Sequence, residues 1–443
     1  MQNDSRLNRI LAFFVFIVST ITYLRTCAPT TSFWDCGEFI TSAYTLGIPH
    51  PPGAPLYLLV GRLFSMIPFA HDIGFRINII SCLASGLTIM LTYLIIVRLI
   101  VMYRGKIQNS IDQLIVYGGA VVGALSLAFS DSFWFNSVEA EVYAISIFFT
   151  AYVIWLIFVW YEKADKPSSD RYILFIAYLI GLVIGVHLLS ILALPVIFLI
   201  IYFRKYTTIN MNTFLIVTGL GALLFFAIYP GIVKWLPNLA LKLQKATGPE
   251  LTAVFFVLLI AMLILGIRSS AVNYRRTAYL ILSSFLVILV AVSTYTAIYI
   301  RSNLNPDLDE NDPESLENMV SYLNREQYGD WSYVDRRAPL WEYQIKKMYI
   351  RYFGWQFIGQ GQTIGEDERI VETLSPRGLF MLPFLVGLVG MFHHFKKDWK
   401  NASAILLLFF MTGLAIVLYL NQENPQPRAD GRGEQAHRGN PRR

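Results

Sequence analysis

The sequence predicts an all-α polytopic membrane protein, and three observations support this fold class. Of the 443 residues, 55% are hydrophobic and only 15% are charged, whereas soluble domains carry about 25% charged residues. The mean hydropathy is +0.50. About eleven apolar runs approach the ~20 residues that a helix needs to cross the hydrocarbon core of a bilayer.

The first apolar run extends from Ile10 to Leu24 and follows Arg6 and Arg9. A cleaved signal peptide has a similar basic and apolar pattern, but no clear small-x-small cleavage site follows this run. We therefore interpret it as an uncleaved first span. The other membrane-length runs are Ile77–Val101, Leu114–Phe129, Val142–Trp160, Tyr172–Val186, Leu188–Phe203, Phe214–Tyr229, Leu251–Ile267, Ala278–Ile300, Leu379–Phe392 and Ala402–Leu420.

The stretch Ala54–Phe69 is apolar but short. As a helix it would reach about 24 Å at 1.5 Å per residue, which is less than the ~30 Å thickness of the hydrocarbon core. It also carries Arg62 at its centre and a proline near each end. We therefore predict an interfacial helix over 54–69 that lies against the outer face of the membrane.

Basic residues gather in alternate connections between the apolar runs. With a cytoplasmic N-terminus, the inner connections hold most of them and the short outer connections hold few. The inner residues are Arg6, Arg9, Arg98, Arg104, Lys106, Lys163, Lys166, Arg171, Arg204, Lys205, Arg268, Arg275, Arg276, Lys396, Lys397 and Lys400, and the outer ones are Arg25, Arg62, Arg76, Lys234, Lys242 and Lys245.

This distribution is the positive-inside pattern of membrane proteins, and it would reverse if Ala54–Phe69 crossed the membrane. It predicts a multi-pass integral protein with a cytoplasmic N-terminus, in the inner (plasma) membrane if the protein is bacterial. The formal net charge of +6 is spread over helix ends and not gathered in one patch. No nucleic-acid partner is therefore expected.

The topology predicts one transmembrane domain over residues 1–420 with several polar segments on the outer, periplasmic or luminal, face. These segments are an outer loop over 25–53, the connection Ser130–Glu141 and one long outer loop over 301–377. The long loop begins acidic and then becomes aromatic and basic, as at Trp331 and Arg351, which suits contact with the headgroups of membrane lipids. Residues 424–443 are rich in proline, glycine and arginine and are predicted to be disordered.

The chain contains three cysteines. Cys27 and Cys36 share the outer loop and can pair if that loop faces an oxidising compartment, but two unlinked thiols fit the sequence equally well. Cys82 lies in an apolar run, where a cysteine usually serves as a small core residue.

The outer loop contains two carboxylates, Asp35 and Glu38, directly after the first span. Because they are three residues apart, they lie on one face of a helix. A capping box, with Asp35 as N-cap and Glu38 reaching back to it, explains the same spacing. Acidic groups beside a bilayer are also candidates for function, and both interpretations can hold together.

A second pair of acids, Glu139 and Glu141, lies at the outer start of a span. Each is also favoured there by the helix macrodipole alone, but two outer loops with acids at matching depth predict convergence on one cavity. His50, between two prolines, is either an ordinary loop residue or a proton-handling group at that cavity. His187 lies in an outer hairpin and is either a structural histidine or part of the site.

Several kinds of site are missing from the sequence. It contains no P-loop, no glycine-rich dinucleotide fingerprint and no nucleophile elbow. No spacing of His, Cys and Asp specifies zinc. Nucleotide-driven transport by this chain alone is therefore not expected.

Three motifs carry a resemblance to a known family. They are Trp-Asp-Cys-Gly-Glu-Phe-Ile from Trp34, Gly-Ile-Pro-His-Pro-Pro-Gly-Ala-Pro-Leu-Tyr from Gly47, and Ser-Val-Glu-Ala-Glu-Val-Tyr from Ser137. With the predicted topology they resemble GT-C class membrane glycosyltransferases. More narrowly, they resemble a protein O-mannosyltransferase family with bacterial homologues of unknown function and a eukaryotic enzyme that modifies plexin-type receptors. The resemblance covers roughly residues 5–428.

The resemblance implies a polyprenyl- or dolichyl-phosphate sugar as donor and transfer, of mannose by expectation, to a Ser/Thr hydroxyl of an acceptor protein on the outer face. It implies that Asp35 is the base and that Glu38 supports it, while a divalent metal is left open. A general base contributes roughly 10²–10⁴-fold to such a step. The expected substrate-binding residues are His50, Arg62, Glu139, Glu141 and His187. Cations must stabilise the leaving phosphate, and the candidates are Arg25, Arg62, Lys234 and Arg301.

Two other functions remain open on the sequence. One is transfer of another sugar to lipid or glycan, and the other is a transporter or flippase, which would need ionisable groups near the bilayer midplane. The chain also departs from the family's pattern after Arg428, where it continues Ala-Asp-Gly-Arg-Gly-Glu and soon ends. This departure leads us to expect a truncated or frame-shifted copy, with its activity in question.

Overall fold

The computed structural model describes residues 6–206, 208–329, 336–364, 370–377 and 379–423. The chain divides into two compact units, the first formed by 1–329 with 387–408 and the second by 330–386 with 409–443. The predicted disordered tail, 424–443, and Trp331 lie outside the described residues. Every residue of the candidate site belongs to the first unit.

Eight helical segments of the described chain are long and apolar enough to cross a membrane. The protein is therefore an all-α polytopic membrane protein, as the composition predicts. The eight segments are Arg6–Thr26 (α1), Ile73–Arg104 (α4), Ser110–Ala128 (α5 to α6), Val142–Lys163 (α8), Pro167–Ile184 (ending in α9), Pro249–Val272 (α13), Arg276–Ser302 (α14 to α15) and Trp399–Leu420 (α19 to α20).

The three other predicted runs also form helices, which are not among these eight segments. Residues 188–203 form a 3-10 turn, Leu188–Ala193, followed by α10, Leu194–Lys205. The next run forms α11, Met211–Tyr229, and the run after Leu379 forms α18, Leu382–Lys397. Several long helices contain π-helical turns, at Leu114–Gly118, Pro230–Trp235 and Met411–Ala415.

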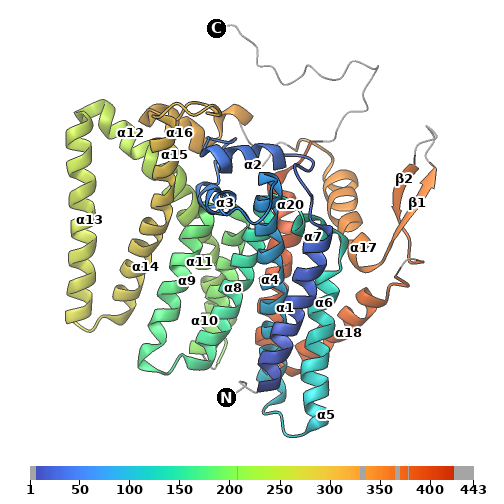
Figure 1. Cartoon of the computed structure of the whole chain (residues 1–443). Helices are drawn as coiled ribbons and strands as arrows, with labels where there is room; N and C mark the ends of the chain where they lie inside the picture. The colour runs from blue at the N-terminus through green and yellow to red at the C-terminus, as the bar shows by residue number, and fades with distance from the viewer. Residues whose placement is uncertain (1–5, 207, 330–335, 365–369, 378, 424–443) are drawn as a thin grey trace. The chain divides into compact units, whose positions relative to one another are not determined.

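Short helices lie at one end of the long helices of the first unit (Figure 1). They include α2, Cys36–Thr45, and α3, Pro55–Met66, with α12, Leu236–Thr247, and α16, Leu316–Asn324. A further short helix, α7, spans Asp131–Ser137. With 12 residues, α3 reaches about 18 Å, too short to cross the membrane, and its interfacial position remains a prediction.

A close helix contact holds α2 against α3. A Cβ on Gly61 of α3 would lie 2.7 Å from the Cβ of Ala43 on α2, so only glycine permits this approach. The apolar residues of α2, Phe39, Ile40 and Ala43, are buried in a core shared with α3, α8, α9 and α10. A second core joins α1, α4 and α6. Burial of this face fixes the direction in which α2 presents its N-terminal end.

Hydrogen bonds fasten the segment after α1 to its neighbours. The side-chain nitrogen of Asn78 on α4 donates to the carbonyl oxygens of Ala28 and Thr30, at 2.7 and 2.8 Å. The backbone N–H of Ala28 donates to the carbonyl oxygen of Val138, at 2.9 Å. These contacts bring the segment leading to α2 beside the connection between α7 and α8, where the second acid pair lies.

The stretch 301–377, predicted as one long outer loop, contains regular structure and is divided between the two units. Its part in the first unit holds α16. Its part in the second unit holds a π-helical segment, Leu340–Ile350, then α17, Arg351–Phe357, and two antiparallel strands. Strand β1, Gln360–Ile364, pairs with β2, Ile370–Leu374, in the register Gln360 to Leu374.

Candidate active site

Asp35 lies directly before the first residue of α2 and follows Trp34, whose φ of 58° turns the chain into the helix. Its side chain is exposed and makes no hydrogen bond that caps α2. Within the described residues, no salt bridge engages it either. An exposed carboxylate that is not committed to capping remains available to accept a proton.

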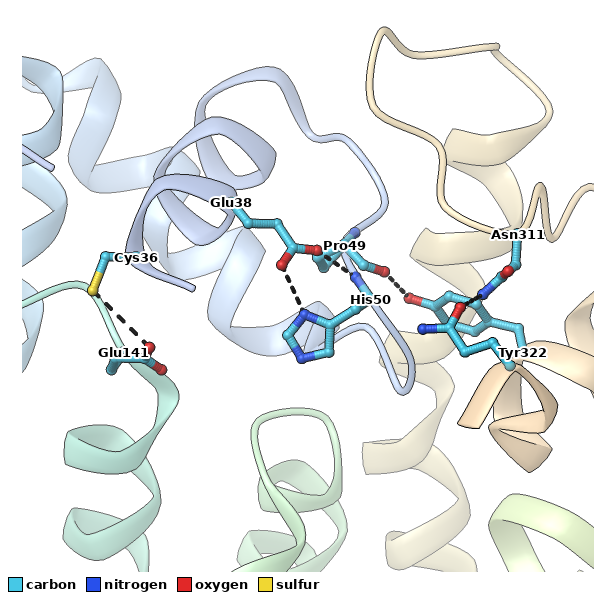
Figure 2. Close-up of polar contacts among 8 residues, drawn as sticks. Cys36, Glu38, Pro49, His50, Glu141, Asn311 and Tyr322 are labelled. Atoms are coloured by element: carbon cyan, nitrogen blue, oxygen red, sulfur yellow. Dashed lines mark hydrogen bonds and ion pairs between the residues drawn. The ribbon is translucent and has the colours of Figure 1, made fainter. Parts of the chain in front are cut away.

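Glu38 also takes no part in a capping box. Its Oε1 accepts a hydrogen bond from the backbone N–H of His50 at 2.5 Å, and its Oε2 lies 2.8 Å from the Nδ1 of the same residue (Figure 2). Because an ionised carboxylate only accepts, Nδ1 carries the proton in this pair. The capping-box interpretation is therefore wrong, since His50 offers Glu38 a charge-assisted partner that the helix N-terminus does not.

This pairing changes the pKa values of both side chains. Burial raises the pKa of Glu38, but the hydrogen bonds from His50 and its charge outweigh burial and bring the pKa below its usual value. The hydrogen bond to Glu38 raises the pKa of His50 against the opposing effect of burial, and the charges of Glu38, Asp35 and Glu310 add to the rise. The pair therefore favours a carboxylate beside an imidazolium.

The turn that carries His50 is also held by α16 and by the segment that precedes it. The backbone N–H of Ile48 donates to the carbonyl oxygen of Leu308 at 2.7 Å, and that of Glu310 donates to the carbonyl oxygen of Ile48 at 3.1 Å. The buried hydroxyl of Tyr322 donates to the carbonyl oxygen of Pro49 at 2.6 Å (Figure 2). His50 is thus positioned both by α2, through Glu38, and by residues 308–322, which lie far from it in the sequence.

The second acid pair is buried. Glu139 is 2% exposed and Glu141 is 5% exposed. The Ser32 hydroxyl donates to Oε2 of Glu139 at 2.8 Å. The Cys36 thiol lies 4.0 Å from Oε1 of Glu141 (Figure 2), and burial followed by the charges of Glu139 and Glu141 raises the pKa of that thiol.

Burial also raises the pKa values of the two buried carboxyls. That of Glu139 rises through burial, against the opposing bonds from Ser32 and Cys36. That of Glu141 rises to about 7 because of burial first and then the negative charges of Asp35 and Glu139. Glu141 is therefore divided between its acid and its carboxylate form near neutral pH, which suits a group that donates or accepts a hydrogen bond.

The two outer segments converge, as the acid positions in the sequence predict. Asp35 interacts electrostatically with both His50 and Glu141, and His50 also interacts electrostatically with Glu141. Asp35, Glu38, His50, Glu139 and Glu141 therefore form one polar cluster at the end of the long helices that carries α2. Their catalytic and binding roles remain predictions.

Arg62 and Arg301 lie elsewhere, at the C-terminal end of α2. Arg62 donates to the carbonyl oxygen of Tyr44 and lies over the Tyr44 ring, 5.5 Å from its centroid. Arg301 donates to the carbonyl oxygens of Leu46 and Thr45, at 2.8 and 3.0 Å. Cations stabilise helix C-termini in this way. Both guanidinium groups are separated from Asp35 by the length of α2, about 15 Å. They stabilise the C-terminal end of that helix. Arg25 is exposed at the end of α1.

A different set of basic groups lies near the acids. Burial, which has the largest effect, and the positive charges of Arg325 and His50 together lower the pKa of His187 to about 4. Its ring packs 5.2 Å from that of Tyr143, measured between centroids. Burial, followed by the charge of Arg325, lowers the pKa of Lys234. Lys234, Arg325 and the neutral ring of His187 thus form a second cluster, which lies next to the acid cluster and carries positive charge.

Arg325 has no local signal that marks it in the sequence. It ends α16 in the left-handed conformation, with a φ of 62°, and lies 4.9 Å from the centroid of the Tyr328 ring. Only the docking of α16 against the His50 turn brings it to the site. Tyr322, one turn earlier, was not predicted for the same reason.

Metal and disulfide chemistry were both left open by the sequence. Among the described residues, no group of three or more His, Cys, Asp and Glu side chains is arranged to hold a metal ion, so no step is assigned to one. Cys27, Cys36 and Cys82 are free thiols. Cys27 interacts with Cys82 on α4 and is not joined to Cys36.

The Glu38–His50 pair gives a pH-dependent prediction. The raised pKa of His50 makes its contribution to stability complete below pH 6.5 and lost as the pH rises through the folded value. The lowered pKa of Glu38 makes its contribution complete above pH 4.5 and lost as the pH falls through the folded value. Glu38→Gln should therefore cost about 1 kcal/mol between these limits, measured by denaturation in micelles, and less at pH 9.

An NMR titration provides the direct readout, because Glu38→Gln should lower the pKa of His50. The control is Glu342→Gln, which removes an exposed ion pair with Lys346. It should change neither the pH dependence of stability nor the pKa of His50. An unchanged His50 pKa in Glu38→Gln would contradict the pairing.

Glu141 provides a second prediction, of opposite sign. Its folded pKa of about 7 exceeds its ordinary 4.5, so wild-type stability falls as the pH rises from 4.5 to 7. Glu141→Gln removes the buried charge and should stabilise the protein by roughly 2 kcal/mol at pH 8, with little change at pH 4.5. Denaturation curves at both pH values measure it. Glu317→Gln, at an exposed carboxylate, serves as control, and equal stabilities of wild type and Glu141→Gln at pH 8 would overturn the assignment.

Comparisons with known proteins bear on residues 35–210, which match a family model described as the protein O-mannosyl-transferase TMEM260 N-terminal domain. The protein O-mannosyl-transferase tmem260 of Dictyostelium discoideum is 27% identical over 160 residues, which are 36% of this chain and 18% of the relative. The Mus musculus protein O-mannosyl-transferase TMEM260 is 29% identical over 136 residues, 30% of this chain and 17% of the relative.

The matched segment begins at Asp35 and includes both acid pairs, His50 and His187. The matches cover less than a fifth of the length of either curated relative. No solved structure matches the chain. The resemblance to protein O-mannosyltransferases that the three motifs indicate is confirmed for this segment.

Proposed function

We propose that the protein is a glycosyltransferase that moves mannose from a polyprenyl- or dolichyl-phosphate donor to a Ser/Thr hydroxyl of a protein on the periplasmic or luminal face. The observation that carries this proposal is the exposed, uncommitted carboxylate of Asp35 beside a buried acid cluster. It begins the segment that is similar to protein O-mannosyl-transferases. Acids at the ends of membrane helices also favour an enzyme over a transporter, whose ionisable groups lie near the midplane.

In the proposed reaction, the acceptor hydroxyl loses its proton to the carboxylate of Asp35. Its oxygen forms the new bond to C1 of the sugar while the bond between C1 and the phosphate oxygen breaks. The electron pair of that bond leaves with the polyprenyl phosphate, which gains one negative charge. Proton removal by a positioned carboxylate contributes roughly 10²–10⁴-fold to the rate.

The departing phosphate needs positive charge at its position. Lys234 and Arg325 supply it, together with a hydrogen bond from neutral His187. These groups replace the candidates Arg62 and Arg301, because both arginines are engaged with backbone carbonyl oxygens at the far end of α2. The Glu38–His50 pair holds the turn between the acids and these basic groups in place.

The proposed face follows from the distribution of basic residues. The helix ends that carry Arg104, Lys163 and Lys205 are opposite to the end that carries α2 in the first unit (Figure 1). Because basic connections remain in the cytoplasm, the site would face the periplasm or the lumen. In this proposal, the lipid-linked donor presents its sugar on that face of the membrane.

The test uses the full chain, reconstituted in vesicles with polyprenyl-phosphate mannose and an acceptor protein. Mass spectrometry of the acceptor should find added hexose on Ser or Thr, and lipid analysis should find free polyprenyl phosphate. GDP-mannose in place of the lipid donor should give no product.

Three results would contradict the proposal, each in a different way. Hexose on a lipid or glycan acceptor alone would assign another transferase. Product from GDP-mannose without lipid would reject the donor. Movement of the intact donor across the vesicle membrane without transfer would identify a flippase.

A further inference from the structure

A second polar site lies at the other end of the first unit. A cavity of about 760 Å³ opens between the first turns of α1, the second half of α4 and the last turns of α8. Ligand cavities in proteins span about 300–1,000 Å³. None of the acids around Asp35 lines it, so it is separate from the candidate active site.

The lining carries a strong excess of positive charge. Among the described residues that line it, four are basic and one, Glu162, is acidic. The carboxylate of Glu162 lies 3.6 Å from Nε of Arg98. The basic residues are Arg9, Arg98, Lys163 and Lys166.

Aromatic side chains contact two of these cations. The guanidinium of Arg98 lies 5.2 Å from the ring centroid of Trp155. Nζ of Lys163 donates to the hydroxyl of Tyr172 at 3.0 Å, and an ammonium has two further N–H groups for another acceptor. Cations that are already ordered lose less side-chain freedom when an anion binds.

Polarity changes with depth in this cavity. Three of its charged residues, Arg9, Glu162 and Lys163, lie in the first turn of α1 and the last turn of α8. Lys166 follows α8, and Arg98 lies on α4 beside Trp155. Apart from Arg98, the wall farther along these helices is apolar. It comprises Ala12, Phe13, Met90, Leu94, Val97, Trp155 and Val159. A ligand that fits both parts has an anionic head and a hydrocarbon tail.

We propose that this cavity binds an anionic glycerophospholipid of the adjoining leaflet, with its phosphodiester among Arg9, Lys163 and Lys166 and one acyl chain against the apolar wall. By the positive-inside pattern this leaflet is the cytoplasmic one. Basic pockets between membrane helices on that side bind anionic headgroups. A zwitterionic lipid fits less well, because its trimethylammonium would meet the same cations.

The experiment measures thermal unfolding of the delipidated full chain in neutral detergent during titration with three probes. These are phosphatidylglycerol, phosphatidylcholine with the same acyl chains, and glycerol 3-phosphate. A ligand that binds only the folded state raises the unfolding temperature in proportion to its occupancy. Phosphatidylglycerol should give the largest shift at equal concentration.

The variant Lys163→Gln with Lys166→Gln should weaken phosphatidylglycerol binding by about 25-fold, since each cation near a lipid headgroup contributes about fivefold. The control is Lys396→Gln with Lys397→Gln, an exposed basic pair on α18 that does not line the cavity. It has the same net charge and should bind like the wild type. If the double variant fails to fold, Arg9→Gln, at an exposed side chain, should weaken binding about fivefold.

Three outcomes would overturn the proposal. Equal shifts with phosphatidylglycerol and phosphatidylcholine would make the cavity an ordinary groove for bilayer lipid. Equal affinity for glycerol 3-phosphate would assign it to a soluble phosphate. An equal loss of phosphatidylglycerol affinity in the two double-lysine variants would show that only the net charge of the protein matters.

Discussion

Replacing Asp35 by asparagine should reduce transfer from the lipid-linked donor by about 10²–10⁴-fold, the usual contribution of a general base. The amide keeps the size of the side chain but does not accept the hydroxyl proton. The loss should fall on kcat, since the acceptor and the lipid keep their other contacts. The unfolding temperature should stay unchanged, because Asp35 is exposed and does not cap α2.

Two further variants separate this effect from a general change of charge. Asp131→Asn removes an exposed acid in the first turn of α7 and should retain full activity. Asp35→Glu keeps the carboxylate at a shifted position and should recover part of the lost rate. Undiminished transfer by Asp35→Asn, with the protein folded, would remove Asp35 from the role of base.

The second large effect concerns Gly53, in the turn after His50. Its φ is 87°, and an added Cβ would lie 2.4 Å from the hydroxyl oxygen of Tyr322. That hydroxyl has little freedom to move, because Tyr322 is 1% exposed and bonded to the carbonyl oxygen of Pro49. Gly53→Ala should therefore lower the free energy of unfolding by about 2–4 kcal/mol through backbone strain, overpacking and loss of that bond.

A double-mutant cycle identifies the steric part of this loss. Tyr322→Phe alone removes one buried hydrogen bond and should cost about 1 kcal/mol. Combined with Gly53→Ala, it removes the oxygen that clashes, so the double variant should lose less than the sum of the single variants. Gly105→Ala is the matched control, since Gly105 has a φ of 93° with nothing within 4 Å of an added Cβ. Strict additivity would contradict a clash with Tyr322.

The long helices were the most predictable part of the fold. The apolar run predicted over Val142–Trp160 is observed as α8, Val142–Lys163, because continuous hydrophobicity of membrane length has few other solutions. The convergence of the acids also followed from the sequence, since topology alone places both outer segments at one end. The regular structure between 336 and 374 did not follow, because polar residues there gave no helical or strand periodicity.

The side-chain partners within the site could not be predicted. Glu38 and His50 are twelve residues apart, and their contact depends on how the Pro-rich turn folds back over α2. Arg62 is well placed in the sequence to meet a phosphate, yet it reaches the nearer carbonyl oxygen of Tyr44. Arg325 lies far along the chain, and only the packing of α16 decides where its guanidinium lies.

The bond between Tyr322 and Pro49 spans 273 residues of sequence, and this separation has a consequence for synthesis. At about 5–20 residues per second, a ribosome needs roughly 14–55 s to pass from one partner to the other. During that interval the nascent chain has already exposed the His50 turn without the hydroxyl that fastens it. The segment 35–210, although it contains every acid of the cluster, therefore waits for α16 before the turn reaches its final form.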